Sequence, residues 1–202
     1  MPRPRTFVEG DVVAAARDAF WRGGYAGTSL DDLTTATGLG KGSLYGAFGD
    51  KHALFMRALD RYCDAALEAT RRQLRGPVEG ASQRLAAYVR ALAALNTADA
   101  ERRGCLMAKS AAELAGGDAA VREKVGRTLT AMHTELTRTI ADAQQEGTIA
   151  AAVDAEKLAS LLLAVLRGIE SLHKSGVDDG VINDAVEQAL QLLPRDEPGG
   201  PE

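Results

Sequence analysis

The sequence predicts an all-α fold of about nine helices, and three observations support this class. Ala, Leu and Arg are abundant, and only 4% of the 202 residues are aromatic, a composition that favours helices over sheets. Apolar residues recur three and four positions apart along most of the chain, which is the helical period. Gly and Pro interrupt this pattern at Gly23-Gly24, Gly76-Pro77 and Gly116-Gly117, which predicts where helices end.

The first predicted helix spans about Val8 to Arg22 and ends at Gly23-Gly24. Its apolar residues recur at helical spacing, so one face should be buried. The preceding segment carries Arg3 and Arg5 between prolines, which block helix formation. Two interpretations of this segment remain open: a frayed terminus, or an arm that contacts phosphate or enters a minor groove.

Residues 28–51 contain two short helical patterns joined by a tight turn, the helix-turn-helix arrangement. Thr28 or Ser29 can cap the first helix with a side-chain oxygen. Asp31-Asp32 then place carboxylates in the first turn, where they complement exposed N–H groups and the positive end of the helix dipole. Gly38 ends this helix because it can adopt a left-handed backbone conformation.

The second helix of this pair runs from about Gly40 to Phe48. Leu44 and Phe48 lie four residues apart and should point inward, which leaves polar side chains with DNA-compatible chemistry outward. Hydroxyls and ammonium groups can reach phosphates and base edges from such a helix. The residues that we expect to contact DNA are Thr28, Ser29, Lys41, Gly42, Ser43, Tyr45 and Lys51.

This stretch resembles the DNA-binding signature of the TetR family of bacterial transcriptional regulators. The resemblance covers about the first third of the chain and implies a three-helix helix-turn-helix DNA-binding domain over residues 1–53. It also implies a helical ligand-binding and dimerisation domain over 54–193, and we expect 194–202 to form a disordered tail. The matching positions are Gly24-Tyr25, Thr28-Ser29-Leu30, Leu33, Gly38-Leu39, Lys41-Gly42-Ser43-Leu44-Tyr45, Phe48, Asp50-Lys51 and Leu54-Phe55.

The recognition helix departs from the family at Gly46 and Ala47, where relatives commonly carry at least one larger polar side chain. Direct base reading from these two positions would be weak. Lys41, Gly42 and Ser43 would then have to approach the bases closely.

Two predicted helices near the C-terminus, opened by Asp154 and Asp178, are apolar over much of their circumference. A helix that is apolar nearly all round must be buried, which is easiest if a second subunit covers one side. The alternative is that both helices complete the core of one chain. The family resemblance also implies a homodimer. The predicted interface residues are Leu161, Val165, Ile169, Val181, Ile182, Ala185, Val186 and Ala189.

The resemblance further implies a small-molecule effector that binds in the core of the larger domain. The effector would release the protein, as a repressor, from a palindromic double-stranded DNA operator. Each candidate pocket residue can equally be an ordinary core residue, and the sequence does not identify the effector. The candidates are Tyr62, Tyr88, Leu92, Cys105, Met107, Ser110, Met132, His133, Leu162 and Leu166.

Cys105 suggests an alternative trigger, a thiol that senses oxidants or electrophiles. It lies near a helix N-terminus, after Arg102-Arg103 and before Lys109, and cations and helix dipoles lower the pKa of a thiol. A small buried filler residue is the competing interpretation. An enzyme built from Cys105 and His133 is not expected, since no catalytic motif accompanies them. The long helical part after Gly76 argues against an architectural DNA-binding protein without a ligand.

Composition limits the remaining classes. Hydrophobic residues make up 46% of the chain and charged residues 26%, as in an ordinary globular protein. No run approaches the roughly 18 apolar residues of a membrane span, and the first residues lack the core of a signal peptide, so we expect a cytoplasmic protein. No Cys/His cluster has zinc spacing, and no metal or cofactor is expected. With a net charge of −4, DNA binding requires a local positive patch.

Overall fold

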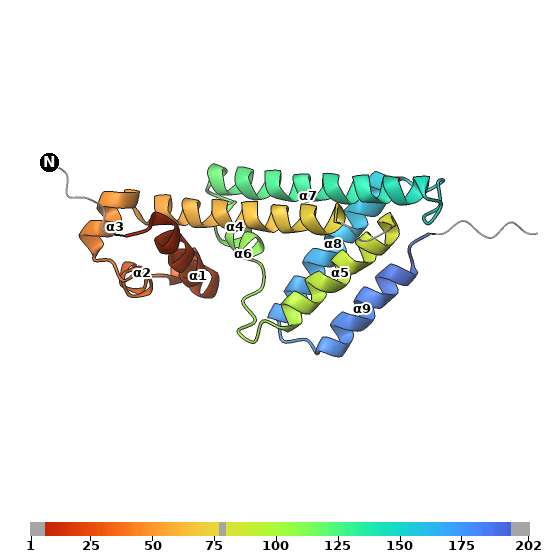
Figure 1. The fold of residues 1–202 in the computed structure, drawn as a ribbon. Helices are drawn as coiled ribbons and strands as arrows, with labels where there is room; N and C mark the ends of the chain where they lie inside the picture. The colour runs from red at the N-terminus through yellow and green to blue at the C-terminus, as the bar shows by residue number, and fades with distance from the viewer. Residues whose placement is uncertain (1–6, 77–79, 195–202) are drawn as a thin grey trace, which may run out of the picture. The chain divides into compact units, whose positions relative to one another are not determined.

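The computed structural model describes residues 7–76 and 80–194, and over these ranges the chain forms nine α-helices and no strand (Figure 1). The all-α prediction is therefore confirmed. None of these helices has the length and apolar character required to cross a membrane. The proposed arm at Arg3 and Arg5 and the predicted tail beyond Pro194 lie outside the described residues. The helices are α1 (Glu9–Gly27), α2 (Leu30–Thr37), α3 (Lys41–Phe48), α4 (Lys51–Leu74), α5 (Ala81–Thr97), α6 (Leu106–Leu114), α7 (Ala119–Gln145), α8 (Ala155–Lys174) and α9 (Asp179–Gln191).

The chain divides into two compact units. The N-terminal unit contains Met1–Ala65 together with Cys105–Gly126, and the C-terminal unit contains Ala66–Gly104 together with Arg127–Glu202. These units differ from the domains that the sequence predicts. The predicted boundary after residue 53 falls inside α4, and α6 packs with α1 in the N-terminal unit.

Aromatic side chains form the centre of the N-terminal unit. The rings of Phe20 and Phe55 meet edge to face with centroids 5.1 Å apart, and Tyr25 contacts Phe55 at 4.9 Å. Trp21 packs against Tyr62 at 5.1 Å, so its ring has a structural role. Edge-to-face pairs add roughly 0.5–1.5 kcal/mol each to the stabilisation that burial of their area provides. Helix α2 packs against α1, which carries Phe20, Trp21 and Tyr25 of this core, and α3 packs against α2.

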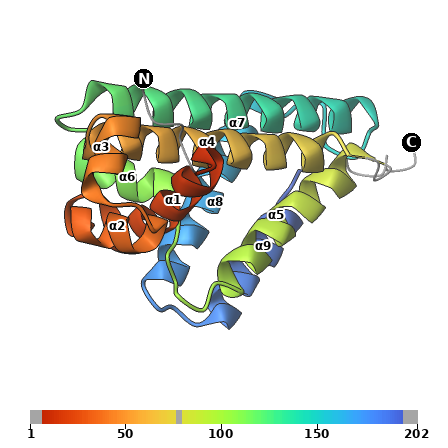
Figure 2. The same ribbon diagram turned by 60° about the vertical axis from the view of Figure 1, so that its left-hand side comes forward.

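In the C-terminal unit, α5, α8 and α9 contact one another, and α5 and α9 run side by side (Figures 1 and 2). Their inward faces share one hydrophobic core with the C-terminal part of α7. The largest completely buried side chains of this core include Leu85, Leu136, Ile140 and Leu166. Truncating such a residue to Ala would cost about 2–5 kcal/mol.

The structure corrects part of the predicted subunit interface. Ile169, Ile182 and Val186 are only 2%, 0% and 3% exposed, and they belong to the core of their own chain. Their side chains are therefore not available to a partner. Leu161 and Val181 are 59% and 53% exposed. The remaining predicted interface residues are partly exposed: Val165, Ala185 and Ala189.

Candidate nucleic-acid interface

Helix α2 begins with a capping box formed by Ser29 and Asp32. Ser29 Oγ accepts a hydrogen bond from the backbone N–H of Asp32 at 3.1 Å, and the carboxylate of Asp32 accepts from the backbone N–H of Ser29 at 2.8 Å. Hydrogen bonds from Ser29 lower the pKa of Asp32. At the other end, Gly38 adopts φ 69° and its N–H donates to Thr34 O at 3.0 Å. The predicted start and end of this helix are thus set by these two local motifs.

Helix α3 has one buried face and one exposed face. Leu44 and Phe48 are 2% and 6% exposed and anchor the helix to the core of the N-terminal unit. Lys41, Gly42 and Ser43 are exposed, and Tyr45 is 48% exposed although its ring is large and apolar. Helix α3 therefore exposes an ammonium group, two hydroxyls and an open glycine backbone, and the outward direction predicted for Lys41, Ser43 and Tyr45 is confirmed.

Lys41 forms an ion pair with Asp31. The sequence predicted only that Asp31 would complement the dipole of its own helix. Lys41 Nζ lies 2.7 Å from Oδ1 of Asp31, in an ion pair that joins α2 to α3. The hydrogen bond that Lys41 donates to Asp31 raises the pKa of Lys41, which stays a cation. An ammonium in this position can contact a phosphate only after it leaves Asp31 or shares its hydrogens with both groups.

Three further predicted contact residues, besides Lys41, have intramolecular partners. Thr28 is 2% exposed and its hydroxyl donates to Gly24 O at 2.6 Å, so the expectation that its side chain contacts phosphate is wrong. Ser29 is exposed, but its N–H and its hydroxyl both donate to Asp32. The ammonium of Lys51 lies 4.4 Å from the centroid of the Tyr25 ring, a cation–π contact at the first turn of α4.

Helix α6 holds the end of α1 and the turn that leads to α2. The carboxylate of Glu113 accepts hydrogen bonds from the backbone N–H groups of Tyr25 at 2.7 Å and Ala26 at 3.3 Å. Lys109 Nζ donates to Trp21 O at 2.6 Å. Gly24 adopts φ 74° at this point, and a Cβ atom there would lie 2.0 Å from Glu113 Oε1. A residue with a Cβ atom at position 24 would be strained at this positive φ and would displace the Glu113 carboxylate from its backbone hydrogen bonds.

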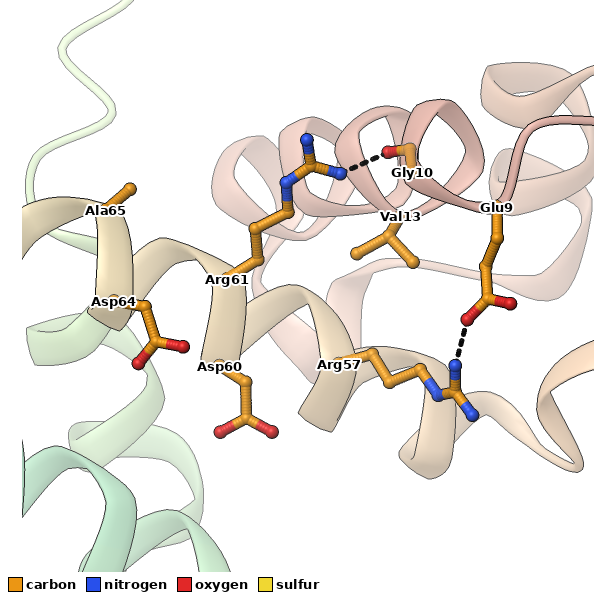
Figure 3. Close-up of a pocket in the computed structure, with 8 residues that line it drawn as sticks. All are labelled: Glu9, Gly10, Val13, Arg57, Asp60, Arg61, Asp64 and Ala65. Carbon is orange, nitrogen blue, oxygen red and sulfur yellow. Dashed lines mark hydrogen bonds and ion pairs between the residues drawn. The ribbon is translucent and has the colours of Figure 1, made fainter.

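The first turn of α1 is fastened to α4 by two arginines (Figure 3). Arg57 forms an ion pair with Glu9, and Arg61 donates to the carbonyl oxygen of Gly10. From the same helix, Asp60 and Asp64 pair with Lys124 of α7 at 3.1 and 2.8 Å. The two arginines thus attach the start of α1 to α4, and the two aspartates attach α4 to α7.

The first turn of α4, which follows α3 directly, is also tied to the start of α7. His52 Nε2 lies 2.6 Å from Asp118 Oδ2, while Asp118 Oδ1 caps α7 by accepting from the backbone N–H groups of Ala120 and Val121. The hydrogen bond from His52 is the main cause that lowers the pKa of Asp118. Several side chains from beyond residue 100 thus determine the position of the helix-turn-helix.

Four of the ten predicted effector-binding residues belong to the N-terminal unit. Tyr62 Oη lies 3.8 Å from Cys105 Sγ, which brings these two predicted residues together. Cys105 is the N-cap residue of α6 and is 6% exposed. Met107 is buried, and Ser110 uses its hydroxyl to donate to Leu106 O within the helix.

The other six lie in the C-terminal unit, where most of them are core residues. Tyr88, Leu162 and Leu166 belong to the hydrophobic core, Leu92 packs against it, and Met132 is buried. Tyr88 Oη lies 3.2 Å from Thr70 Oγ1, and burial raises the pKa of Tyr88.

His133 is a helix-to-helix contact rather than a core residue. Its Nε2 lies 3.0 Å from Ser160 Oγ and 3.1 Å from Glu156 O, so it joins α7 to α8. His133 therefore lies on a partly exposed face of α7.

Comparisons with known proteins agree with this geometry. The family model described as "Bacterial regulatory proteins, tetR family" matches residues 12–58, and the "Tetracyclin repressor-like, C-terminal domain" matches residues 81–190. HTH-type transcriptional repressor ComR of Escherichia coli (strain K12) is 30% identical over 198 residues, which cover 95% of this chain and 91% of that protein. HTH-type transcriptional repressor DhaR of Mycobacterium sp. (strain GP1) is 27% identical, with 81% of each chain covered.

Solved structures show the same fold. One is the TetR family transcriptional regulator CifR, a cysteine mutant complexed with 26-base-pair double-strand operator DNA. It is 34% identical to this chain and has a TM-score of 0.78, and the match covers 96% of this chain and all of that chain. E. coli NemR in its reduced form has a TM-score of 0.82 at 18% identity, with 92% of this chain and 96% of that chain covered, and supports the fold alone.

An all-helical chain with an N-terminal helix-turn-helix and a larger helical C-terminal part belongs to a class of DNA-binding transcriptional regulators. The chain is a member of the TetR family. This family is not a class of enzymes.

Proposed function

We propose that this protein is a repressor that binds a palindromic operator as a homodimer and is released by a small-molecule effector. The observation that carries the proposal is the exposed face of α3, where Lys41, Ser43 and Tyr45 stand outward while Leu44 and Phe48 hold the helix in place. The names of ComR and DhaR support a repressor, and the DNA complex of CifR supports an operator as partner.

An exposed apolar stripe on α8 and α9 supports the homodimer. Leu161 and Leu172 on α8 are 59% and 37% exposed, and Val181 on α9 and Leu192, the C-cap residue of that helix, are 53% and 71% exposed. Each pair is separated by about three helical turns, so the exposed residues of each helix lie along one side. A partner's α8 and α9 would cover this stripe and form a four-helix interface. The isologous contact places two recognition helices on one duplex, with half-sites roughly 34–36 Å apart.

The effector would act by favouring one separation of the two recognition helices over another. Such control requires that the effector bind the two conformations with different affinity. The contacts of Lys109 and Glu113 with α1 give α6 a direct hold on the helix-turn-helix, so a displacement of α6 would move the end of α1 and the start of α2. This supports α6 as the element that receives the effector signal.

Selection of bound sites from random duplex DNA tests the proposal. We expect one enriched palindrome whose half-sites are about one helical turn apart. The recovered operator, labelled with a fluorophore, can then be titrated with metabolite fractions to find the effector by loss of anisotropy. Recovery of DNA without an inverted repeat, or equal weak binding to every sequence, would contradict the proposal.

A second candidate, a thiol-based sensor, is favoured by the position of Cys105. This residue caps α6, the helix whose Lys109 and Glu113 hold α1, and its sulfur adjoins the hydroxyl of Tyr62. A new bond from Sγ to an electrophile would add atoms at a buried position and displace α6. Operator binding should then fall on treatment with an electrophile in the wild type but not in Cys105→Ser. Loss of binding in both proteins would reject the thiol.

A further inference from the structure

A small pocket of the C-terminal unit lies where α4 ends and is separate from the residues predicted to bind an effector. Its volume is about 220 Å³. Pockets that hold drug-sized ligands measure roughly 300–1,000 Å³, so this one suits a smaller molecule. Its lining is mainly charged and polar, and comprises Leu74, Arg75, Gly76, Arg84, Arg138, Thr139 and Asp142.

Two of the three pocket arginines are held in place by neighbours. Arg75 forms two hydrogen bonds with the carboxylate of Glu135, which is 5% exposed and also pairs with Arg71 at 3.2 Å. Burial raises the pKa of Glu135, but the hydrogen bonds from Arg75 and Arg71 outweigh burial and hold that pKa below its usual value. Arg84 Nε donates to Leu74 O at 2.9 Å, which orients its guanidinium along the pocket.

The third arginine adds a positive charge to the pocket, and no carboxylate among the described residues forms an ion pair with it. Arg138 of α7 is exposed, and over the described part of the chain no acidic side chain pairs with it. Asp142 lies 3.9 Å from Arg84, beyond hydrogen-bond distance. Arg75, Arg84 and Arg138 thus bring three guanidinium groups to one small pocket, in a chain whose net charge is −4.

We propose that this pocket binds a phosphate group, either as free phosphate or as the phosphoryl group of a small metabolite. The planar guanidinium matches the oxygens of such an anion in a bidentate arrangement, and charge-assisted hydrogen bonds of this kind are the stronger ones. The guanidinium of Arg138 supplies a cation for such an anion beside those of Arg75 and Arg84. Because Arg75 and Arg84 are already oriented, binding needs to order only Arg138.

The test is a calorimetric titration of the full-length protein, without DNA, in Tris-chloride at constant ionic strength with inorganic phosphate as the probe. We expect saturable binding that weakens at least tenfold in Arg138→Gln. Arg72→Gln is the matched control, since Arg72 is 65% exposed, has the same charge and pairs only loosely with Glu68 at 3.8 Å. Its affinity for phosphate should stay within twofold of the wild type.

A parallel titration with glycerol 3-phosphate separates the two sources. Tighter binding of the ester assigns the pocket to a phosphorylated metabolite, and equal or weaker binding assigns it to free phosphate. Absence of saturable binding, or equal loss in the Arg138 and Arg72 variants, would overturn the proposal, because such a loss reports only general screening. The titration contains no DNA, so its failure leaves the repressor proposal untouched.

Discussion

Asp31 should limit the affinity of this protein for DNA, and its replacement by Asn is the most informative single change. The carboxylate lies 2.7 Å from the ammonium of Lys41, the cation at the start of the recognition helix. Lys41 must give up part of this contact to reach a phosphate, and Asp31 itself repels the DNA backbone. Asp31→Asn removes both effects, so operator affinity should rise.

The size of the effect follows from the exposure of the pair. The side chains of Lys41 and Asp31 are 55% and 77% exposed, and ion pairs so accessible to water are weak. We therefore expect a gain of about 1.5- to 5-fold for each recognition helix, or about 2- to 25-fold for a dimer. Lys41→Ala should instead weaken binding. It should also make the salt dependence shallower, by about 0.9 in the logarithmic slope for each phosphate that Lys41 neutralises in the wild type.

Fluorescence anisotropy on the selected operator, between roughly 50 and 200 mM salt, measures both quantities. Asp11→Asn provides a control, since Asp11 is an exposed carboxylate in the first turn of α1. Asp31→Asn should improve binding less in the Lys41→Ala background than in the wild type, because only the repulsion between Asp31 and DNA is then left to remove. If Asp31→Asn raises affinity equally in both backgrounds, the two side chains do not compete. If it lowers affinity, Asp31 itself contacts DNA and the reasoning is refuted.

Three further predictions concern DNA contact, subunit contact and acid stability. Tyr45→Phe should weaken operator binding about 2- to 12-fold per helix, because one hydrogen bond is removed, and it should leave the melting temperature unchanged. Unchanged affinity in both Tyr45→Phe and Lys41→Ala would reject the exposed face of α3 as the DNA contact surface. The double substitution Leu161→Glu and Val181→Glu should yield folded monomers by light scattering, and a persistent dimer would place the interface elsewhere. Glu135→Gln should lower the free energy of unfolding by about 1–2 kcal/mol at pH 7. Because the folded pKa of Glu135 is depressed, this contribution is complete above the ordinary value of 4.5 and disappears as pH falls through the lower folded pKa. Denaturation curves with the same difference at pH 7 and at pH 3 would contradict that origin.

Local motifs explain why so much of the helix-turn-helix could be predicted from the sequence. The capping box of Ser29 and Asp32 and the left-handed Gly38 act within a few residues, so their effect depends little on the remaining fold. The inward direction of Leu44 and Phe48 follows from helical spacing in the same way.

The errors concern contacts between distant segments. Thr28 and Ser29 are adjacent and both can cap a helix, but only packing against α1 turns the Thr28 hydroxyl toward Gly24. The pair of Lys41 and Asp31 depends on the angle between α2 and α3, which no residue pattern specifies. No sequence pattern indicates that α6 packs with α1 either, because Lys109 and Glu113 bind backbone groups rather than complementary side chains.

The subunit interface illustrates a different difficulty. Val181 and Ile182 are consecutive apolar residues, yet one is 53% exposed and the other is completely buried. In a helix that is apolar over much of its circumference, periodicity does not distinguish the side that faces the chain's own core from the side that faces a partner. Only the position of α9 against α5 and α8 separates the two.

The discontinuous N-terminal unit restricts how regulators of this kind can exchange their DNA specificity. The chain leaves the unit at Ala65 and returns at Cys105, and the returning segment supplies Lys109 and Glu113, which hold the end of α1. A chimera that joins the first 53 residues of one regulator to the remainder of another would pair a foreign α6 with the native α1. Position 24 would then have to match a new residue at position 113. A chimera that also transfers residues 105–126, and so includes α6, would preserve the contacts of Lys109 and Glu113 with α1.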